Sequence, residues 1–200
     1  MSGLTIYYMR HGETAWSLTG QHTGKTDLPL TAHGEDQARH LRQTLERVNF
    51  SLVVTSPRQR AQRTCELAGL GEMAEVDPDL AEWDYGEYEG LKSVVIREQR
   101  PGWNIFRDGC PGGETPDQVV RRVDQLIARL RKLEGNIALF AHGQLGQVLV
   151  ARWMGWPVVE GQHFSIDPAS LGILGYKHRM PDQPVVQLWN YAPENFAPAS

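Results

Sequence analysis

Two histidines stand directly after apolar runs of the chain, and each is followed by a glycine. Arg10 and His11 end the run that begins at residue 6, and His142 follows residues 137–141. Short continuous apolar runs are typical of buried strands, and open α/β sheets build their sites at the carboxyl ends of strands. We predict that His11 is a nucleophile in phosphoryl transfer and that Arg10 holds the phosphate. An ordinary turn histidine is the alternative for His11 alone, and the repetition of the pattern at His142 argues against it.

A third apolar run, at residues 50–55, ends at Ser56 and leads into a predicted helix. That helix carries three arginines, namely Arg58, Arg60 and Arg63. A helix that begins at a strand end directs its first N–H groups and the positive end of its dipole toward the same site. Arg60 lies near this start and is a candidate phosphate ligand. A solvated basic face is the simpler interpretation for Arg63.

Residues 80–90 place four carboxylates among aromatic residues and glycines. A carboxylate that loses water among aromatic side chains has a raised pKa, and it can then serve as an acid near neutral pH. The stretch is therefore a candidate source of a general acid. A turn-rich surface patch is the alternative.

Strands and helices are expected to alternate along the chain. Apolar spacing and turn residues predict helices near residues 38–48, 119–133 and 145–154, further strands at 75–76, 169–176 and 185–189, and a loop at 15–30. This order predicts an α/β fold: a three-layer sandwich with a mainly parallel sheet and helices on both faces. We expect one domain over residues 1–200, with a small cap-like insertion at about 83–116 and a loose tail at about 192–200.

The bulk composition excludes several classes of protein. The net charge of −4 argues against a general nucleic-acid binder or a membrane-surface binder. The two cysteines, Cys65 and Cys110, form neither a CxxC nor a zinc pattern and fit a reducing compartment. No apolar run reaches the roughly 18 residues that a membrane span requires, and no signal peptide is visible. The expected location is cytoplasmic.

Four motifs, met in order along nearly the whole chain, resemble those of the histidine phosphatase superfamily, which includes phosphoglycerate mutases and many phosphatases. They are Arg-His-Gly-Glu-Thr at residues 10–14, residues 56–64 with Arg60 at the phosphate-binding arginine, Glu82 at the acid, and Ala-His-Gly at residues 141–143. The resemblance implies a phosphoglycerate mutase-like fold without a metal or another cofactor. It also implies that His11 forms a phosphohistidine, that Arg10, Arg60 and His142 bind the phosphoryl group, and that Glu82 is the proton donor.

Within this superfamily, residues 20–31 and 82–90 look like the sedoheptulose-bisphosphatase group and related bacterial phosphatases. We expect Ser17, Gln21 and Thr23 to line the substrate pocket and Gln144 to contribute a backbone N–H. Cofactor-dependent mutases carry a longer basic insertion after the acid. Here residues 91–114 are short, and their cations are Lys92, Arg97, Arg100 and Arg107.

The resulting hypothesis is a phosphatase that hydrolyses small phosphate monoesters, such as sugar phosphates or bisphosphates. A cofactor-dependent mutase is the first alternative, and a non-catalytic phosphate-binding regulatory module is the second. A zinc site is disfavoured because no HxxEH-like or three-ligand cluster accompanies the histidines. We expect a small phosphorylated substrate, no nucleic acid or membrane partner, and a monomer or homodimer, because Trp153, Trp156 and Phe164 fit either a core or a dimer patch.

Overall fold

A mixed sheet forms the centre of the computed structural model, which describes residues 3–180 and 183–193. Its six strands have the order β3-β2-β4-β1-β5-β6. The strands are β1 (Thr5–Arg10), β2 (Phe50–Thr55), β3 (Ala74–Val76), β4 (Asn136–Ala141), β5 (Leu171–Tyr176) and β6 (Pro184–Tyr191). The first four of these run parallel, and β5 and β6 form an antiparallel edge. The prediction of a mainly parallel sheet is confirmed.

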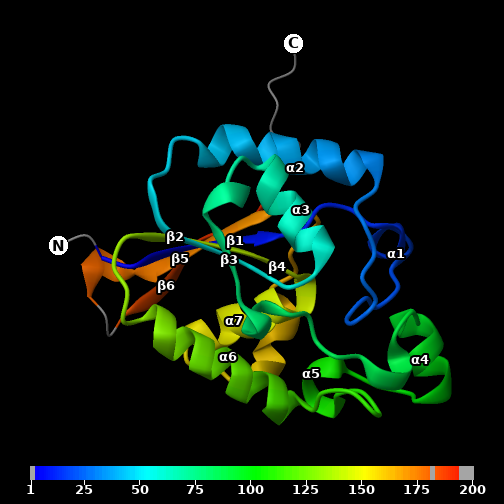
Figure 1. Cartoon of the computed structure of the whole chain (residues 1–200). Coiled ribbons are helices and arrows are strands. Elements are labelled where there is room, and N and C mark those ends of the chain that lie inside the picture. The colour runs from blue at the N-terminus through cyan, green and yellow to red at the C-terminus, as the bar shows by residue number, and fades with distance from the viewer. Residues whose placement is uncertain (1–2, 181–182, 194–200) are drawn as a thin grey trace.

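Helices cover both faces of the sheet (Figure 1). On one face lie α2 (Ala32–Leu45) and α3 (Gln59–Leu67), and on the other lie α6 (Pro116–Leu130) and α7 (Gly143–Trp153). Two separate clusters of buried apolar residues fill the layers between the helices and the sheet. The predicted three-layer sandwich is therefore confirmed. Among the described residues, no helix is long and apolar enough to cross a bilayer.

Several predicted boundaries differ from the structure. The expected loop at residues 15–30 begins with a short helix, α1 (Ala15–Thr19), because Thr14 and Ser17 form a capping box. Helix α2 ends at Leu45, before the expected end at Val48. The predicted tail lies mostly outside the described residues, which end at 193.

Residues 83–116 contain a 3-10 helix at Gly86–Tyr88 and two short α-helices, α4 (Ser93–Gln99) and α5 (Ile105–Asp108). Figure 1 places them at one end of the molecule, below α1. Trp83 and Trp103 of this segment are buried in the same core cluster as residues of β1 and α7. That the segment acts as a cap remains a prediction.

The turn after β1 depends on a close contact between two backbones. A Cβ on Gly12 would lie 2.3 Å from the carbonyl oxygen of Gly34, and a Cβ on Gly34 would lie 2.1 Å from that of Glu13. The hydroxyl of Thr64 accepts the Gly12 N–H at 3.0 Å. Helices α2 and α3 therefore hold the segment that carries His11 in place. Only glycine fits at positions 12 and 34, where the two backbones meet.

We predict that Gly34→Ala lowers the free energy of unfolding by about 1–3 kcal/mol, because its methyl group would overlap backbone atoms that cannot rotate away. This expected change in the free energy of unfolding is opposite in sign to the usual one, because alanine normally stabilises a helix interior by about 1 kcal/mol relative to glycine. Urea denaturation measures the difference. Gln43→Ala, at an exposed position of the same helix, serves as the control with a change within about 0.5 kcal/mol. A stabilised Gly34→Ala variant would contradict the prediction.

Candidate active site

The first histidine is held with one ring nitrogen free. His11 follows β1 and is 5% exposed, and its Nδ1 lies 2.7 Å from the carbonyl oxygen of Gly12. Because a carbonyl oxygen only accepts hydrogen bonds, Nδ1 is the protonated nitrogen and Nε2 keeps its lone pair. Burial, with the charges of Arg60 and Arg10, holds the pKa of His11 well below its usual value. The imidazole is thus neutral near neutral pH.

The second histidine lies beside the first because β1 and β4 are parallel neighbours. Arg10 pairs with Ala141 in the register, so the residues that follow them, His11 and His142, lie next to each other. Their ring centroids are 5.2 Å apart. The Nε2 atom of His142 lies 2.7 Å from the Ser56 hydroxyl, and its Nδ1 is buried without a partner among the described residues. Burial lowers the pKa of His142 well below its usual value, and the charge of Arg60 contributes.

The two predicted arginines are both held by backbone carbonyls. Arg10 donates from Nη1 to the carbonyl of Ile166 at 2.6 Å. Arg60 is fully buried and donates to carbonyls of the loop at residues 23–26, at 2.9 to 3.1 Å. Carbonyl oxygens orient a guanidinium without neutralising it, so both residues keep their positive charge near the histidines. Arg63, in contrast, is half exposed and pairs with Glu35 and Glu66, as expected for a solvated face.

The predicted acid sits at the N-terminus of α7. Glu82 is 7% exposed, and its carboxylate accepts the backbone N–H groups of Trp83, Gln144 and Leu145 at 2.8 to 3.1 Å. Burial raises the pKa of Glu82, although these N–H groups and the charge of Arg60 oppose the shift. The sequence predicted that the Gln144 N–H would serve the substrate. In the structure, Glu82 occupies that N–H.

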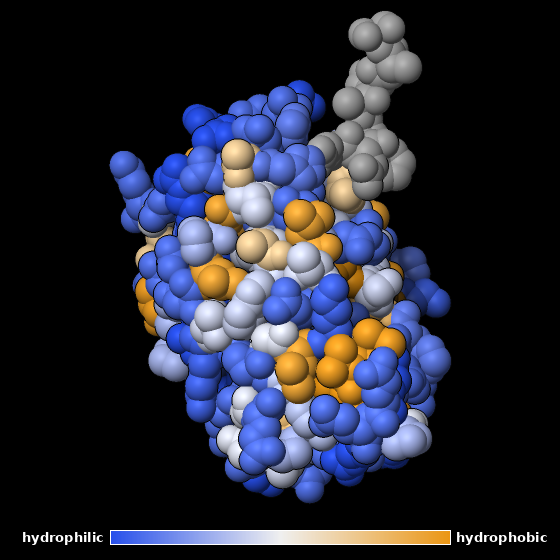
Figure 2. All heavy atoms as spheres, turned by 90° about the vertical axis from the view of Figure 1, so that its right-hand side faces the viewer, coloured by the Kyte–Doolittle hydropathy of each residue, from blue (hydrophilic) through white to orange (hydrophobic). Residues whose placement is uncertain are grey.

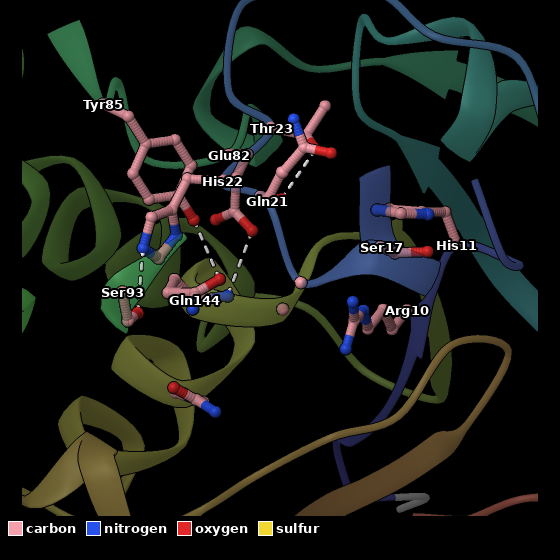
Figure 3. Close-up of a pocket in the computed structure, with 13 residues that line it drawn as sticks. Arg10, His11, Ser17, Gln21, His22, Thr23, Glu82, Tyr85, Ser93 and Gln144 are labelled. Carbon is pink, nitrogen blue, oxygen red and sulfur yellow. Dashed lines mark hydrogen bonds between the residues drawn. The ribbon is translucent and has the colours of Figure 1, made fainter. Parts of the chain in front are cut away.

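A cavity of about 200 Å³ opens beside these groups. Its lining contains seven of the predicted site residues, namely Arg10, His11, Ser17, Gln21, Thr23, Glu82 and Gln144. Figure 3 shows Arg10, His11 and Ser17 together on one side of it. Arg60 and His142 are not in the lining. The His142 ring contacts the His11 ring, and the charge of Arg60 acts on His11.

Two of the predicted pocket residues have their polar groups occupied within the protein. The carboxamide of Gln21 donates to the Gly90 carbonyl at 2.9 Å and accepts the hydroxyl proton of Thr19 at 2.6 Å. The Ser17 hydroxyl donates to the Thr14 carbonyl at 3.0 Å and accepts the Thr14 N–H at 2.8 Å. These side chains shape the wall of the cavity, and their remaining capacity for contacts with a ligand is small.

Four polar lining residues were not predicted from the sequence: His22, Tyr85, Ser93 and Gln147. His22 stacks on Tyr85 with ring centroids 4.6 Å apart, and its Nε2 lies 3.1 Å from the Ser93 hydroxyl. Burial lowers the pKa of His22 to about 4. Gln147 lies one helical turn after Gln144 and therefore on the same face of α7. This spacing in the sequence could have been used to predict Gln147 as a lining residue.

Comparisons with known proteins agree with this geometry. The family model described as histidine phosphatase superfamily (branch 1) matches residues 6–192. The chain is 42% identical over 177 residues to an acid phosphatase of Mycobacterium tuberculosis, covering 86% of this chain and 87% of that protein. It is 34% identical to a sedoheptulose 1,7-bisphosphatase of Saccharomyces cerevisiae, with 90% of each chain covered.

A solved structure of an open reading frame product from Mycobacterium tuberculosis superimposes with a TM-score of 0.90 at 37% identity, covering 94% of this chain and 98% of that one. The fold, the order of the motifs and the similarity over nearly the whole length point to one family. The chain belongs to branch 1 of the histidine phosphatase superfamily.

Proposed function

We propose that this histidine phosphatase hydrolyses small phosphate monoesters, with sugar phosphates as the preferred class, through a phosphohistidine on His11. The observation that carries the proposal is the state of that imidazole. Its Nδ1 is committed to the Gly12 carbonyl, which leaves Nε2 unprotonated beside a cavity that Arg10 and Glu82 also line. The phosphatases among the relatives, an acid phosphatase and a sedoheptulose 1,7-bisphosphatase, support the same reaction class.

In the first step, Nε2 of His11 bonds to phosphorus while the bond from phosphorus to the ester oxygen breaks. Charge on the transferring group spreads over its equatorial oxygens, so positioned cations and N–H donors stabilise the transition state. Arg10 lines the cavity and provides a planar guanidinium group for these oxygens. Arg60 and His142 are buried and do not line the cavity, and Arg60 adds its positive charge to the potential at the transferring group.

Glu82 supplies the proton that the leaving alkoxide needs. Its raised pKa favours the carboxylic acid that this step requires. In the second step, the resulting carboxylate takes a proton from water as the water oxygen bonds to phosphorus and the nitrogen–phosphorus bond breaks. Inorganic phosphate leaves, and His11 and Glu82 return to their starting protonation states.

The basic residues of the 91–114 segment bear on the choice between hydrolysis and mutase chemistry. Lys92, Arg97, Arg100 and Arg107 are all exposed, and none lines the cavity. A bisphosphoglycerate intermediate would need cations to hold it during transfer. We therefore favour net hydrolysis. Metal independence, a cytoplasmic location and a monomeric or homodimeric state remain predictions.

We predict that His11→Ala lowers phosphate release from a sugar phosphate by at least about 10⁴-fold, because the proposed reaction passes through a bond between phosphorus and Nε2 of this residue. Release is measured with chelator present, and trapping of the intermediate is followed by mass spectrometry on residue 11. His40→Ala, a change of an exposed histidine on α2, is the matched control with unchanged activity. Substantial turnover by a folded His11→Ala variant would refute the nucleophile. Transfer of phosphate between positions without accumulation of free phosphate would favour the mutase.

We predict that Glu82→Gln slows the first step, formation of the phosphohistidine, by about 10²–10⁴-fold with alkyl phosphates and far less with aryl phosphates, because an aryl oxide leaves without protonation. Single-turnover release of the alcohol or phenol measures this step apart from hydrolysis of the phosphohistidine, in which Glu82 also acts. The pH profile gives a second readout. A raised pKa keeps the acid protonated at higher pH than an ordinary glutamate, and activity on alkyl esters falls as the pH rises through that pKa.

This alkaline decline should be absent from the residual activity of Glu82→Gln, since glutamine does not titrate. Equal losses in the first step on both ester classes, or an unchanged decline, would show that Glu82 is not the acid. The wild-type profile on an aryl ester is the internal reference, because its first step does not depend on the proton donor.

A further inference from the structure

The cavity has an end with a cation and an end without one, which we call the neutral end. Arg10 is the cation among the residues that line it, and Figure 3 shows Arg10 next to His11. Glu82 lies on the other side in that view, beside Gln144, and is the uncharged acid in the proposed first step. That other side also shows His22, Tyr85 and Ser93. With a pKa of about 4, His22 is neutral near neutral pH. The described residues at this second end therefore offer hydrogen bonds but no positive charge to a ligand.

Two carboxamides are available at the neutral end. The Tyr85 hydroxyl donates to Oε1 of Gln144 at 2.8 Å, which orients the amide and leaves its Nε2 as a donor. Gln147 lies one helical turn further along α7 and also lines the cavity. No described residue forms a hydrogen bond with its carboxamide. A carboxamide can donate and accept hydrogen bonds, and so can a neutral hydroxyl group, so the two are well matched.

The positive groups nearest to this end either lie outside the cavity lining or are hydrogen-bonded to Glu82. The N-terminus of α7 would attract an anion, but Glu82 accepts the N–H groups of Gln144 and Leu145. Arg97 is exposed, its Nε donates to the Trp103 carbonyl, and it does not line the cavity. Its effect on the His22 ring is opposed by the charge of Glu89. A second phosphate placed here would lose water without gaining a cation.

We infer that the substrate carries a single phosphate on a neutral, hydroxyl-bearing remainder, and that Gln144 and Gln147 at the neutral end recognise this remainder and select against a second anionic group. The inference rests on the proposed phosphatase function and narrows it to monophosphates. It assigns Gln147 as a specificity-determining residue for the hydrolysis.

The first test compares matched esters: a hexose 6-phosphate, the corresponding hexose 1,6-bisphosphate and an aryl phosphate. We expect kcat/KM to be at least about tenfold higher for the monophosphate than for the bisphosphate. A bisphosphate hydrolysed as well as the monophosphate would overturn the inference while leaving the phosphatase function intact. Absence of phosphate release from all three esters would refute the phosphatase function itself.

The second test adds a cation to the neutral end. Gln147→Arg should raise the ratio of bisphosphate to monophosphate kcat/KM about tenfold, because it supplies the missing charge. Gln125→Arg, at an exposed position of α6, makes the same change of charge away from the cavity and should leave the ratio unchanged. Equal effects of the two substitutions, or no effect of either, would overturn the assignment of Gln147.

The third test removes the hydrogen-bonding groups of the Gln147 side chain and keeps its size. Gln147→Met should raise KM for the hexose 6-phosphate about fivefold, the loss expected for one hydrogen bond. The KM for the aryl phosphate, which has no hydroxyl to offer, should change less. Circular dichroism confirms that the variant is folded, and equal changes in both KM values would contradict recognition of the hydroxyl-bearing remainder.

Discussion

The placement of two arginine charges beside two buried imidazoles is the constraint on which the site depends. Arg10 and Arg60 are oriented by backbone carbonyls, and their charges, together with burial, keep His11 and His142 unprotonated. A buried charge is costly unless another group balances it. Asp27 lies 4.0 Å from Arg60, and an incoming phosphate can balance the charge of Arg10, which lines the cavity. The arrangement that maintains a neutral nucleophile therefore also attracts the anion that the nucleophile attacks.

This electrostatic arrangement requires a rigid framework, because attack on phosphorus needs reacting atoms held in line. The parallel register of β1 and β4 brings the two histidines together. The Tyr8 hydroxyl accepts the backbone N–H of His142 at 3.1 Å and donates to its carbonyl at 2.6 Å, which ties the second histidine to the first strand. The contact between Gly12 and Gly34 adds the layer of α2 to this support.

The acid depends on a different part of the chain. Arg122 of α6 donates to the carbonyls of Asp79 and Ala81 at 2.8 and 2.7 Å and pairs with Glu114. These contacts of Arg122 fix the backbone directly before Glu82. The Glu82 carboxylate then accepts hydrogen bonds from the N-terminus of α7. One carboxylate therefore connects the segment after α3 to the helix that follows His142. The same contact removes the free N–H groups of that helix from the ligand, which leaves the carboxamides to define the far end of the cavity.

The amino-acid sequence was sufficient to predict the layered α/β architecture and the position of both histidines at strand ends. These features arise from local periodicity and from short motifs, Arg10-His11-Gly12 above all, whose residue types carry their meaning without knowledge of distant contacts. It also identified Arg60 and Glu82 by their place in ordered motifs. Which polar atoms of the site remain available to a ligand could be read from the folded chain alone. Glu82 accepts the Gln144 N–H, the Gln21 carboxamide donates to the Gly90 carbonyl, and Gln147 lines the cavity. All three depend on contacts between segments far apart in the chain, because packing and not sequence spacing sets hydrogen-bond partners.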